Sequence, residues 1–194
     1  MNSPVSESTH ATVLVVDDEP EVADVYALRL ETAYDTRVAY GGEEALEAVD
    51  DDVDIVLLDR RMPGLSGDEV LERLRDRGHD TRVVMLTAVD PGMDIIDMPF
   101  DDYLCKPVEK DDLTAAIDQQ LRAKRYDTRL SEYMEVTSKL ALLEAELSAQ
   151  EVSKNEELQE LSRRADDLKA QMDDALEGFE DIDTAFREIG RHHG

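Results

Sequence analysis

Three short runs of consecutive apolar residues constrain the fold of this chain most strongly. They are Val13–Val16, Ile55–Leu58 and Val83–Leu86. Runs that are apolar at every position are typical of strands buried on both faces of a parallel sheet. Parallel strands need crossover connections, and amphipathic segments do separate these runs.

The first 122 residues therefore predict a doubly wound α/β fold, in which a five-stranded parallel sheet carries helices on both faces. Ser66 and Glu69 form a capping box that predicts the start of one of these helices. The expected strands are Thr12–Val16, Thr36–Ala39, Asp54–Leu58, Arg82–Leu86 and Asp102–Cys105.

Polar residues follow four of the expected strands: Asp17 with Asp18, Asp59, Thr87 and Lys106. The carboxyl ends of parallel strands border one crevice, so we expect these side chains to converge there. Three clustered carboxylates repel one another, and Mg²⁺, which prefers oxygen ligands, would relieve that repulsion. A carboxylate in such a pocket can attack phosphorus when the metal and the lysine neutralise the phosphoryl charge.

Each of these residues also has an ordinary structural explanation. An Asp-Asp pair after a strand often caps a helix, and Asp59 could cap the following loop in the same way. Lys106 is the hardest to explain structurally, because an unpaired ammonium group is costly at a buried strand end. We expect Cys105 to be a small buried apolar residue rather than a reactive thiol.

Four motifs give the chain a specific resemblance. They are VLVVDDEP (13–20), LLDRRMPGLSGDEVL (57–71), MLTA (85–88) and DDYLCKP (101–107). In this order, each beside a predicted strand, they make residues 11–122 resemble the receiver domain of two-component response regulators, which has a flavodoxin-like fold.

The resemblance implies that Asp59 is the phosphoacceptor and that the cofactor is Mg²⁺. Asp18, Asp59 and the backbone carbonyl of Arg61 would ligate the metal directly, and Asp17 would act through water. The phosphoryl donor would be a sensor histidine kinase. The chain would then not be an enzyme beyond self-catalysed phosphoryl transfer and autodephosphorylation. A phosphatase of related chemistry is disfavoured, because its general acid would stand at the position of Arg61.

The same resemblance assigns the phosphoryl-binding and switch residues. Thr87 and the amide of Ala88 would hold the phosphoryl group, and Lys106 would pair with it. Tyr103 would swing inward when Thr87 is drawn to the phosphate. The Lys106–Pro107 peptide is a candidate for the cis form.

Two positions beside the pocket, Arg61 and Val89, would tune the lifetime of the acyl phosphate. The interval from Thr87 to Lys106 is a few residues shorter than in typical receivers. Residues 89–98 therefore leave room for a short fourth helix at most, and the sequence does not decide whether that helix forms.

From residue 123 onward the apolar residues recur at steps of three and four, which predicts a helical tail with a heptad seam. The seam is interrupted by polar residues at Glu144, Glu151 and Lys154. Either one long coiled coil crosses this interruption, or a helical hairpin turns near Gln150–Asn155. In the hairpin, Ser153 or Asn155 would cap the second helix.

Residues 123–194 resemble the HalX domain, a helical module found after receivers in halophilic archaea. The match includes the run RYDTRLSEYMEVTSKLALLE (125–144). We expect this coiled-coil or hairpin tail to mediate self-association or binding of a protein partner. The alternative is a DNA-binding transcriptional regulator that acts through the tail, which the acidity disfavours.

The chain carries 21 basic and 48 acidic residues, a net charge of −27. Such a surface repels nucleic-acid phosphates and anionic lipids at long range. Acidity spread along the whole chain is typical of proteins from halophiles, whose high salt screens self-repulsion. No window approaches 18 consecutive apolar residues, so we expect no membrane span. We further expect a cytoplasmic protein with a disordered lead-in over residues 1–10.

Overall fold

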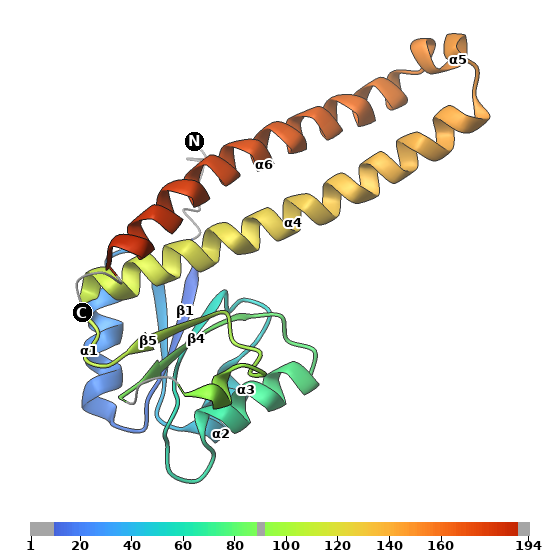
Figure 1. Cartoon of the computed structure of the whole chain (residues 1–194). Coiled ribbons are helices and arrows are strands. Elements are labelled where there is room, and N and C mark those ends of the chain that lie inside the picture. Colours follow the sequence, from blue (N-terminus) through green and yellow to red (C-terminus); the bar gives the residue numbers. More distant parts are fainter. Residues whose placement is uncertain (1–9, 89–91, 190–194) are drawn as a thin grey trace, which may run out of the picture. The chain divides into compact units, whose positions relative to one another are not determined.

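The computed structural model describes residues 10–88 and 92–189, with side chains through residue 177 in the last helix (Figure 1). The expected disordered lead-in, apart from residue 10, and the tuning position Val89 lie outside the described residues. The chain forms two compact units that divide between Leu121 and Arg122. Within the described ranges, no helix combines the length and apolar character that crossing a membrane requires.

The first unit contains a five-stranded parallel sheet in the order β2-β1-β3-β4-β5, which confirms the predicted fold class. Strands β3 and β4 run one residue further than predicted, so Asp59 and Thr87 are the last residues of their strands. The strands are β1 Thr12–Val16, β2 Asp35–Ala39, β3 Ile55–Asp59, β4 Arg82–Thr87 and β5 Asp102–Cys105.

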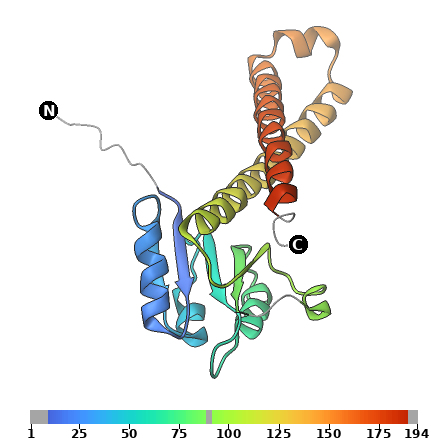
Figure 2. The ribbon, with the colours of Figure 1, turned by 60° about the vertical axis from the view of Figure 1, so that its left-hand side comes forward.

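Helices cover both faces of this sheet (Figures 1 and 2). Helix α1 (Pro20–Leu30) and the first turns of α4 (Lys110–Glu146) cover one face, and α2 (Gly42–Ala48) and α3 (Gly67–Asp76) cover the other. Because both faces are covered, the alternating side chains of β1 pack in two cores. Val13 and Val15 pack on the first face, and Leu14 and Val16 pack on the second. All four are fully buried, as the continuous apolar run predicted.

The shortened connection between β4 and β5 contains a single 3₁₀ turn, η1 (Met93–Ile95). Over residues 92–101, which the structure describes, the chain forms no α-helix. The expectation of a short fourth helix at most is therefore confirmed, and within the described residues of this segment the only helical turn is η1.

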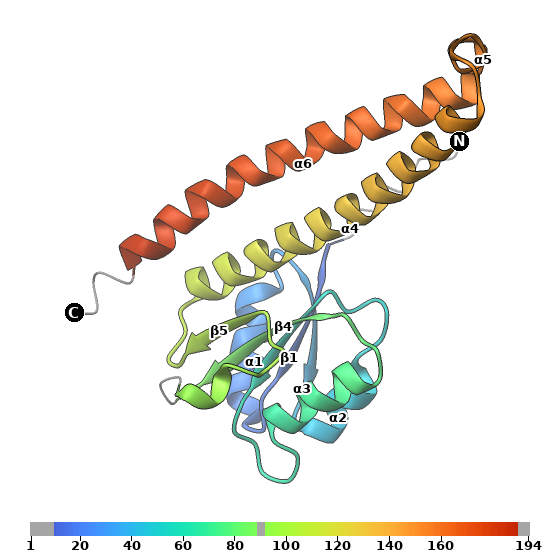
Figure 3. The same cartoon turned by 45° about the vertical axis from the view of Figure 1, so that its right-hand side comes forward.

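The tail folds back on itself, so of the two interpretations the helical hairpin is correct (Figures 1 and 3). Helix α4 ends at Glu146, a short α5 (Ala149–Lys154) occupies the turn, and α6 (Glu156–Ile189) returns. Asn155 rather than Ser153 caps α6, since its Oδ1 accepts the N–H groups of Glu157 and Leu158 at 3.0 and 3.2 Å.

The heptad seam packs inside this hairpin. A cluster joins α4 to α6, and the carboxylate of Glu132 accepts hydrogen bonds from Arg164 across the same interface, the shorter at 2.6 Å. The buried members of the cluster are Val136, Ala165 and Leu168, with Tyr133, Leu140 and Leu161 packed against them. The seam side chains beyond residue 177 lie outside the described residues. The described part of the seam thus has a partner within the chain.

Shortening Leu168 to alanine is expected to destabilise the hairpin, because this side chain is only 1% exposed in the cluster. Loss of a buried leucine costs about 2–5 kcal/mol. Leu176→Ala on the same helix is the matched control, since Leu176 is 46% exposed. Thermal and urea unfolding followed by circular dichroism should show a large loss for Leu168→Ala only. Equal effects of the two changes would contradict the packing described.

Candidate functional site

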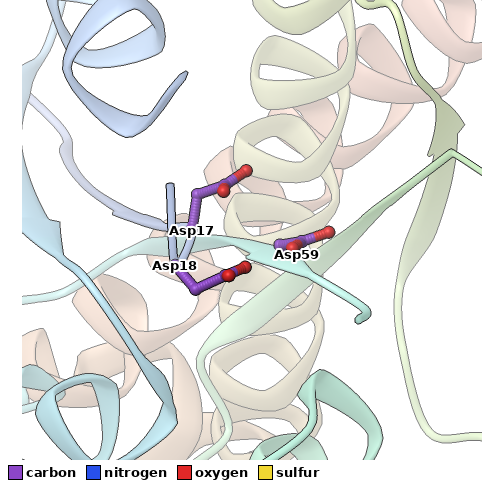
Figure 4. Close-up of side chains that lie close together, drawn as sticks. All are labelled: Asp17, Asp18 and Asp59. Carbon is purple, nitrogen blue, oxygen red and sulfur yellow. The ribbon is translucent and has the colours of Figure 1, made fainter. Parts of the chain in front are cut away.

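Three carboxylates gather at the carboxyl edge of the sheet, as the strand ends predicted (Figure 4). Asp17 and Asp18 follow β1, and Asp59 ends β3. Each offers an oxygen that lies within 4.8 Å of the oxygens of the other two. Asp17 and Asp59 are buried, and Asp18 is half-buried. The two strands are neighbours in the sheet, so their ends bring these residues together.

Lys106, which directly follows the edge strand β5, reaches this acidic cluster at the same carboxyl edge of the sheet. Its Nζ donates a hydrogen bond to Asp17 Oδ2 at 2.6 Å and lies 3.3 Å from Asp59 Oδ1. Burial opposes the charged form of the amine, but the hydrogen bond to Asp17 and the charges of both carboxylates outweigh it and raise the pKa of Lys106. The lysine therefore remains an ammonium group between two carboxylates.

Asp17 has a hydrogen-bond partner on each of its carboxylate oxygens. Its Oδ1 accepts the backbone N–H of Glu19 at 3.0 Å, which orders the turn before α1, while its Oδ2 holds Lys106. Helix α1 has Glu19 as its N-cap without a side-chain capping bond, so Asp17 supports the turn rather than capping the helix, and its role as a site residue stays a prediction.

The environment of Asp59 disfavours its charge. Burial, together with the neighbouring Asp17 carboxylate, raises the pKa of Asp59 to about 6, although Lys106 and the backbone N–H of Arg61 act in the opposite direction. A carboxylate held so close to two others is a site at which a cation would be bound favourably.

Hard oxygen donors and a net negative charge fit Mg²⁺ well, since that ion is usually bound by one or two carboxylates and retained waters. Asp17, Asp18 and Asp59 would hold it. The N–H of Arg61 hydrogen-bonds Asp59, and the Arg61 side chain is exposed. The role of the Arg61 carbonyl as a further ligand stays a prediction.

The remaining predicted residues border the same edge. Thr87 is 1% exposed at the end of β4, and its carbonyl accepts the N–H of Lys106 at 2.6 Å. Ala88 is exposed, and Tyr103 is half-buried on β5 with its ring centroid 5.6 Å from that of Phe100. The Lys106–Pro107 peptide is cis, as the resemblance suggested.

Cys105 corrects one expectation, because its side chain is exposed rather than buried. It ends β5, which is the last strand of the sheet and, among the described residues, has no neighbouring strand on its outer side. The residues before Cys105, Asp101 to Leu104, do not by themselves show that this strand would be the edge.

Sequence reasoning missed Arg60, the residue after Asp59. Its guanidinium forms a two-point hydrogen-bonded pair with Asp68 and also binds Asp94. An arginine next to a strand end is typical of a solvated surface, and its partners lie 8 and 34 residues further along the chain. No local pattern could have identified them.

Removing the charge of Asp59 should stabilise the metal-free protein above about pH 6. The pKa rises from 3.8 in the unfolded chain to about 6 in the folded one, so the folded state binds more protons between these values. The contribution of Asp59 to the free energy of unfolding therefore falls as pH rises from 4 to 6. Asp59→Asn should gain on the order of 2 kcal/mol at pH 8 in EDTA.

Thermal unfolding at pH 8 and pH 4, with EDTA or Mg²⁺, measures this effect. The difference between Asp59→Asn and the wild type should vanish near pH 4, and Mg²⁺ should stabilise the wild type more than the variant. A variant less stable than the wild type in EDTA at pH 8 would contradict the cost assigned to this carboxylate.

Comparison with known families decides the identity of the first unit. The family model described as the response regulator receiver domain matches residues 13–118, more than half of the chain. The chain belongs to the response regulator receiver family. The HalX domain model matches residues 122–189, directly after the receiver, so the predicted combination of domains is confirmed.

Individual relatives agree with this assignment. A candidate transcriptional regulator of Haloferax volcanii is 40% identical over 179 residues, which is 92% of this chain and 31% of that protein. The uncharacterised transcriptional regulatory protein YkoG of Bacillus subtilis is 41% identical over 115 residues, 57% of this chain and 50% of its own length. The chain thus spans a third to a half of the curated relatives that it matches.

Solved structures place the receiver fold in the same family. The receiver domain of Francisella response regulator 1452 is 31% identical and superimposes with a TM-score of 0.54. The match covers 59% of this chain and 98% of that domain. The receiver therefore accounts for the α/β unit, and the HalX domain for the helical hairpin.

Proposed function

We propose that this receiver is a phosphorylation-controlled switch that accepts a phosphoryl group on Asp59 with the help of Mg²⁺. The observation that carries the proposal is the meeting of Asp17, Asp18 and Asp59 with the ammonium group of Lys106. A carboxylate nucleophile, a set of metal ligands and a fixed cation are the parts that phosphoryl transfer to aspartate requires.

The reaction follows from these positions. An oxygen of Asp59 attacks phosphorus, and the bond from phosphorus to the donor's leaving atom breaks, with its electron pair going to the donor. The bound metal would supply positive charge to the phosphoryl oxygens. Lys106, freed in part from Asp59, would pair with one phosphoryl oxygen, and Thr87 would donate its hydroxyl proton in a hydrogen bond to another.

The product is an acyl phosphate that water hydrolyses with time, which suits a reversible signal rather than a turnover enzyme. A sensor histidine kinase is the proposed donor, and a cytoplasmic location belongs to the same proposal because such a kinase consumes ATP. A second acidic residue for phosphatase chemistry is missing two positions after Asp59, where Arg61 stands.

The proposed docking site of the kinase is the surface of α1 beside the phosphoacceptor. Val25 and Leu28 are 44% and 63% exposed, and both stand on α1, which begins directly after the acidic pair. A hollow lies between α1 and the Pro107–Glu109 segment that follows Lys106. An apolar partner surface placed here would bring a phosphohistidine toward Asp59.

Incubation with acetyl phosphate tests the proposed chemistry. Intact-mass spectrometry should show the gain of one phosphoryl group when Mg²⁺ is present and little or none in EDTA. A chain that gains no phosphoryl group with Mg²⁺, from acetyl phosphate or from phosphoramidate, would overturn the proposal. Equal uptake in Mg²⁺ and EDTA would overturn the role of the metal.

The HalX hairpin is the proposed output element, through association with a second copy or with another protein. Its described surface exposes Met134 and Leu142, at 61% and 71%, outside the cluster that joins α4 to α6. Light scattering after size exclusion, with and without beryllofluoride, tests self-association. A monomer under both conditions would remove the self-association branch.

DNA binding by the tail is a second candidate, which the description of the Haloferax volcanii relative as a candidate transcriptional regulator favours. The tail carries 10 basic and 18 acidic residues, so its own charge opposes contact with phosphates at low salt. High salt would weaken that repulsion. Absence of a promoter shift in concentrated KCl, phosphorylated or not, would exclude this candidate.

A further inference from the structure

Arg60 occupies an unusual position for a charged side chain, since it is only 11% exposed and contacts three separate elements. Its Nε and Nη2 donate to the two oxygens of Asp68, at the start of α3, at 3.0 and 3.2 Å. Nη2 also binds the carboxylate of Asp94 in η1, and the guanidinium hydrogen-bonds Tyr103 on β5. These partners hold the pKa of Arg60 above its usual value.

The backbone of Arg60 is fixed as firmly as its side chain. Its N–H donates to the carbonyl of Leu86 on β4 at 2.8 Å, and its carbonyl accepts the N–H of Gly67 at 2.9 Å. A Cβ on Gly67 would lie 2.2 Å from the carbonyl oxygen of Asp59, so α3 begins in close contact with the phosphoacceptor's own backbone. A shift of the Asp59 backbone must therefore displace Arg60 as well.

The turn that Arg60 holds has little else to fix it. None of the residues of η1 is buried, and Met93 and Ile96 are 82% and 66% exposed. Two backbone hydrogen bonds of the turn are long, at 3.4 Å from Ile95 to Gly92 and from Ile96 to Met93, and a third, from Met98 to Ile95, is 3.1 Å. A segment with few buried contacts opens at low cost, so one charged pair has a large influence on it.

We infer that Arg60 is a positioning residue that transmits the phosphorylation state of Asp59 to the η1 turn and to Tyr103. The inference rests on the proposed function, because it needs Asp59 to be the phosphorylated residue. A guanidinium has five donors in a fixed planar arrangement, which lets one side chain hold α3, η1 and β5 together. Phosphorylation replaces the carboxylate of the neighbouring residue with an acyl phosphate that carries nearly two negative charges, and thereby changes the balance among these partners.

Hydrogen exchange of the full chain tests the inference, with the amides of residues 93–98 as the readout and Mg²⁺ with beryllofluoride as the probe for the phosphorylated state. In the wild type, the probe should change exchange in this segment. Arg60→Gln and Asp94→Asn should each speed its exchange about tenfold without the probe, the factor expected for loss of one charge-assisted hydrogen bond. Both variants should also lose the response to the probe.

Two comparisons separate transmission from simple loss of structure. Arg73→Gln changes an exposed arginine on α3 and should behave as the wild type. Phosphoryl uptake from acetyl phosphate should stay within about threefold in Asp94→Asn, whose exposed side chain lies outside the acidic cluster, even if Arg60→Gln folds poorly.

The results that would overturn the role of Arg60 differ from those that would overturn the proposed function. A wild type that takes up phosphoryl but shows no change over residues 93–98 would overturn the inference and leave the proposed function standing. So would an Asp94→Asn variant that keeps the wild-type exchange and response. A wild type that takes up no phosphoryl group would overturn both.

Discussion

Asp59→Asn is expected to take up no phosphoryl group from acetyl phosphate in Mg²⁺, where the wild type takes up one. The amide is a very weak nucleophile, and the change also removes one of the three oxygen donors of the cluster. The loss should therefore be complete rather than partial. Intact-mass spectrometry over a time course, at equal protein and Mg²⁺ concentrations, measures it.

Asp51→Asn serves as the matched control, because Asp51 is exposed in the turn before β3 and remote from the strand ends that form the site. It should be phosphorylated at the wild-type rate. Full phosphorylation of Asp59→Asn would show that another residue is the acceptor and would contradict the central assignment.

Lys106→Met is expected to slow phosphorylation by about 10²-fold, the usual effect of removing one preorganised group that stabilises charge in the transition state. The ammonium group lies 2.6 Å from Asp17 and 3.3 Å from Asp59, so it already stands where phosphoryl charge would develop. Methionine keeps most of the side-chain volume but supplies no charge. Phosphorylation rates at saturating Mg²⁺ give the comparison.

Lys110→Met, at the exposed start of α4, is the control for removing a lysine charge from this acidic receiver. It should reduce the rate by less than about threefold, in keeping with the small effect of an exposed charge. Equal rates in Lys106→Met and the wild type would mean that the lysine only neutralises the resting site.

The sheet and the core of the site could be predicted from sequence because both follow from local patterns. Continuous apolar runs specify strands buried on both faces, and a parallel sheet brings the ends of such strands to one edge. The polar side chains at the strand ends therefore lie at one edge of the sheet, as their positions in the sequence predicted. They are Asp17, Asp18, Asp59, Thr87 and Lys106. The predicted bounds differ from the observed ones by one residue at the start of β2, at both ends of β3 and at the end of β4.

The sequence did not decide between a hairpin and one long helix in the tail, because two signals competed there. The heptad register continued across this region, which was compatible with one long helix, while the polar residues Glu144, Glu151 and Lys154 on the seam were compatible with a turn. The capping side chains of Ser148 and Asn155 instead begin new helices, and packing of Leu168 against α4 makes the return favourable. That packing is tertiary and has no local signature.

Arg60 and Cys105 were missed or misjudged for a related reason. The role of Arg60 depends on Asp68 and Asp94, which the fold brings to it from other elements. The exposure of Cys105 depends on β5 being the edge strand, which follows from strand order rather than from composition. Residues whose environment is set by topology need the structure.

Locating the transferred phosphoryl group at residue level tests the central claim most directly. After incubation with acetyl phosphate and Mg²⁺, borohydride reduction of the acyl phosphate followed by peptide mass spectrometry identifies the modified residue. The assignment of Asp59 as the phosphoacceptor predicts modification at Asp59 alone, with Asp17 and Asp18 unmodified. Modification of either of those residues, or of none, would contradict it.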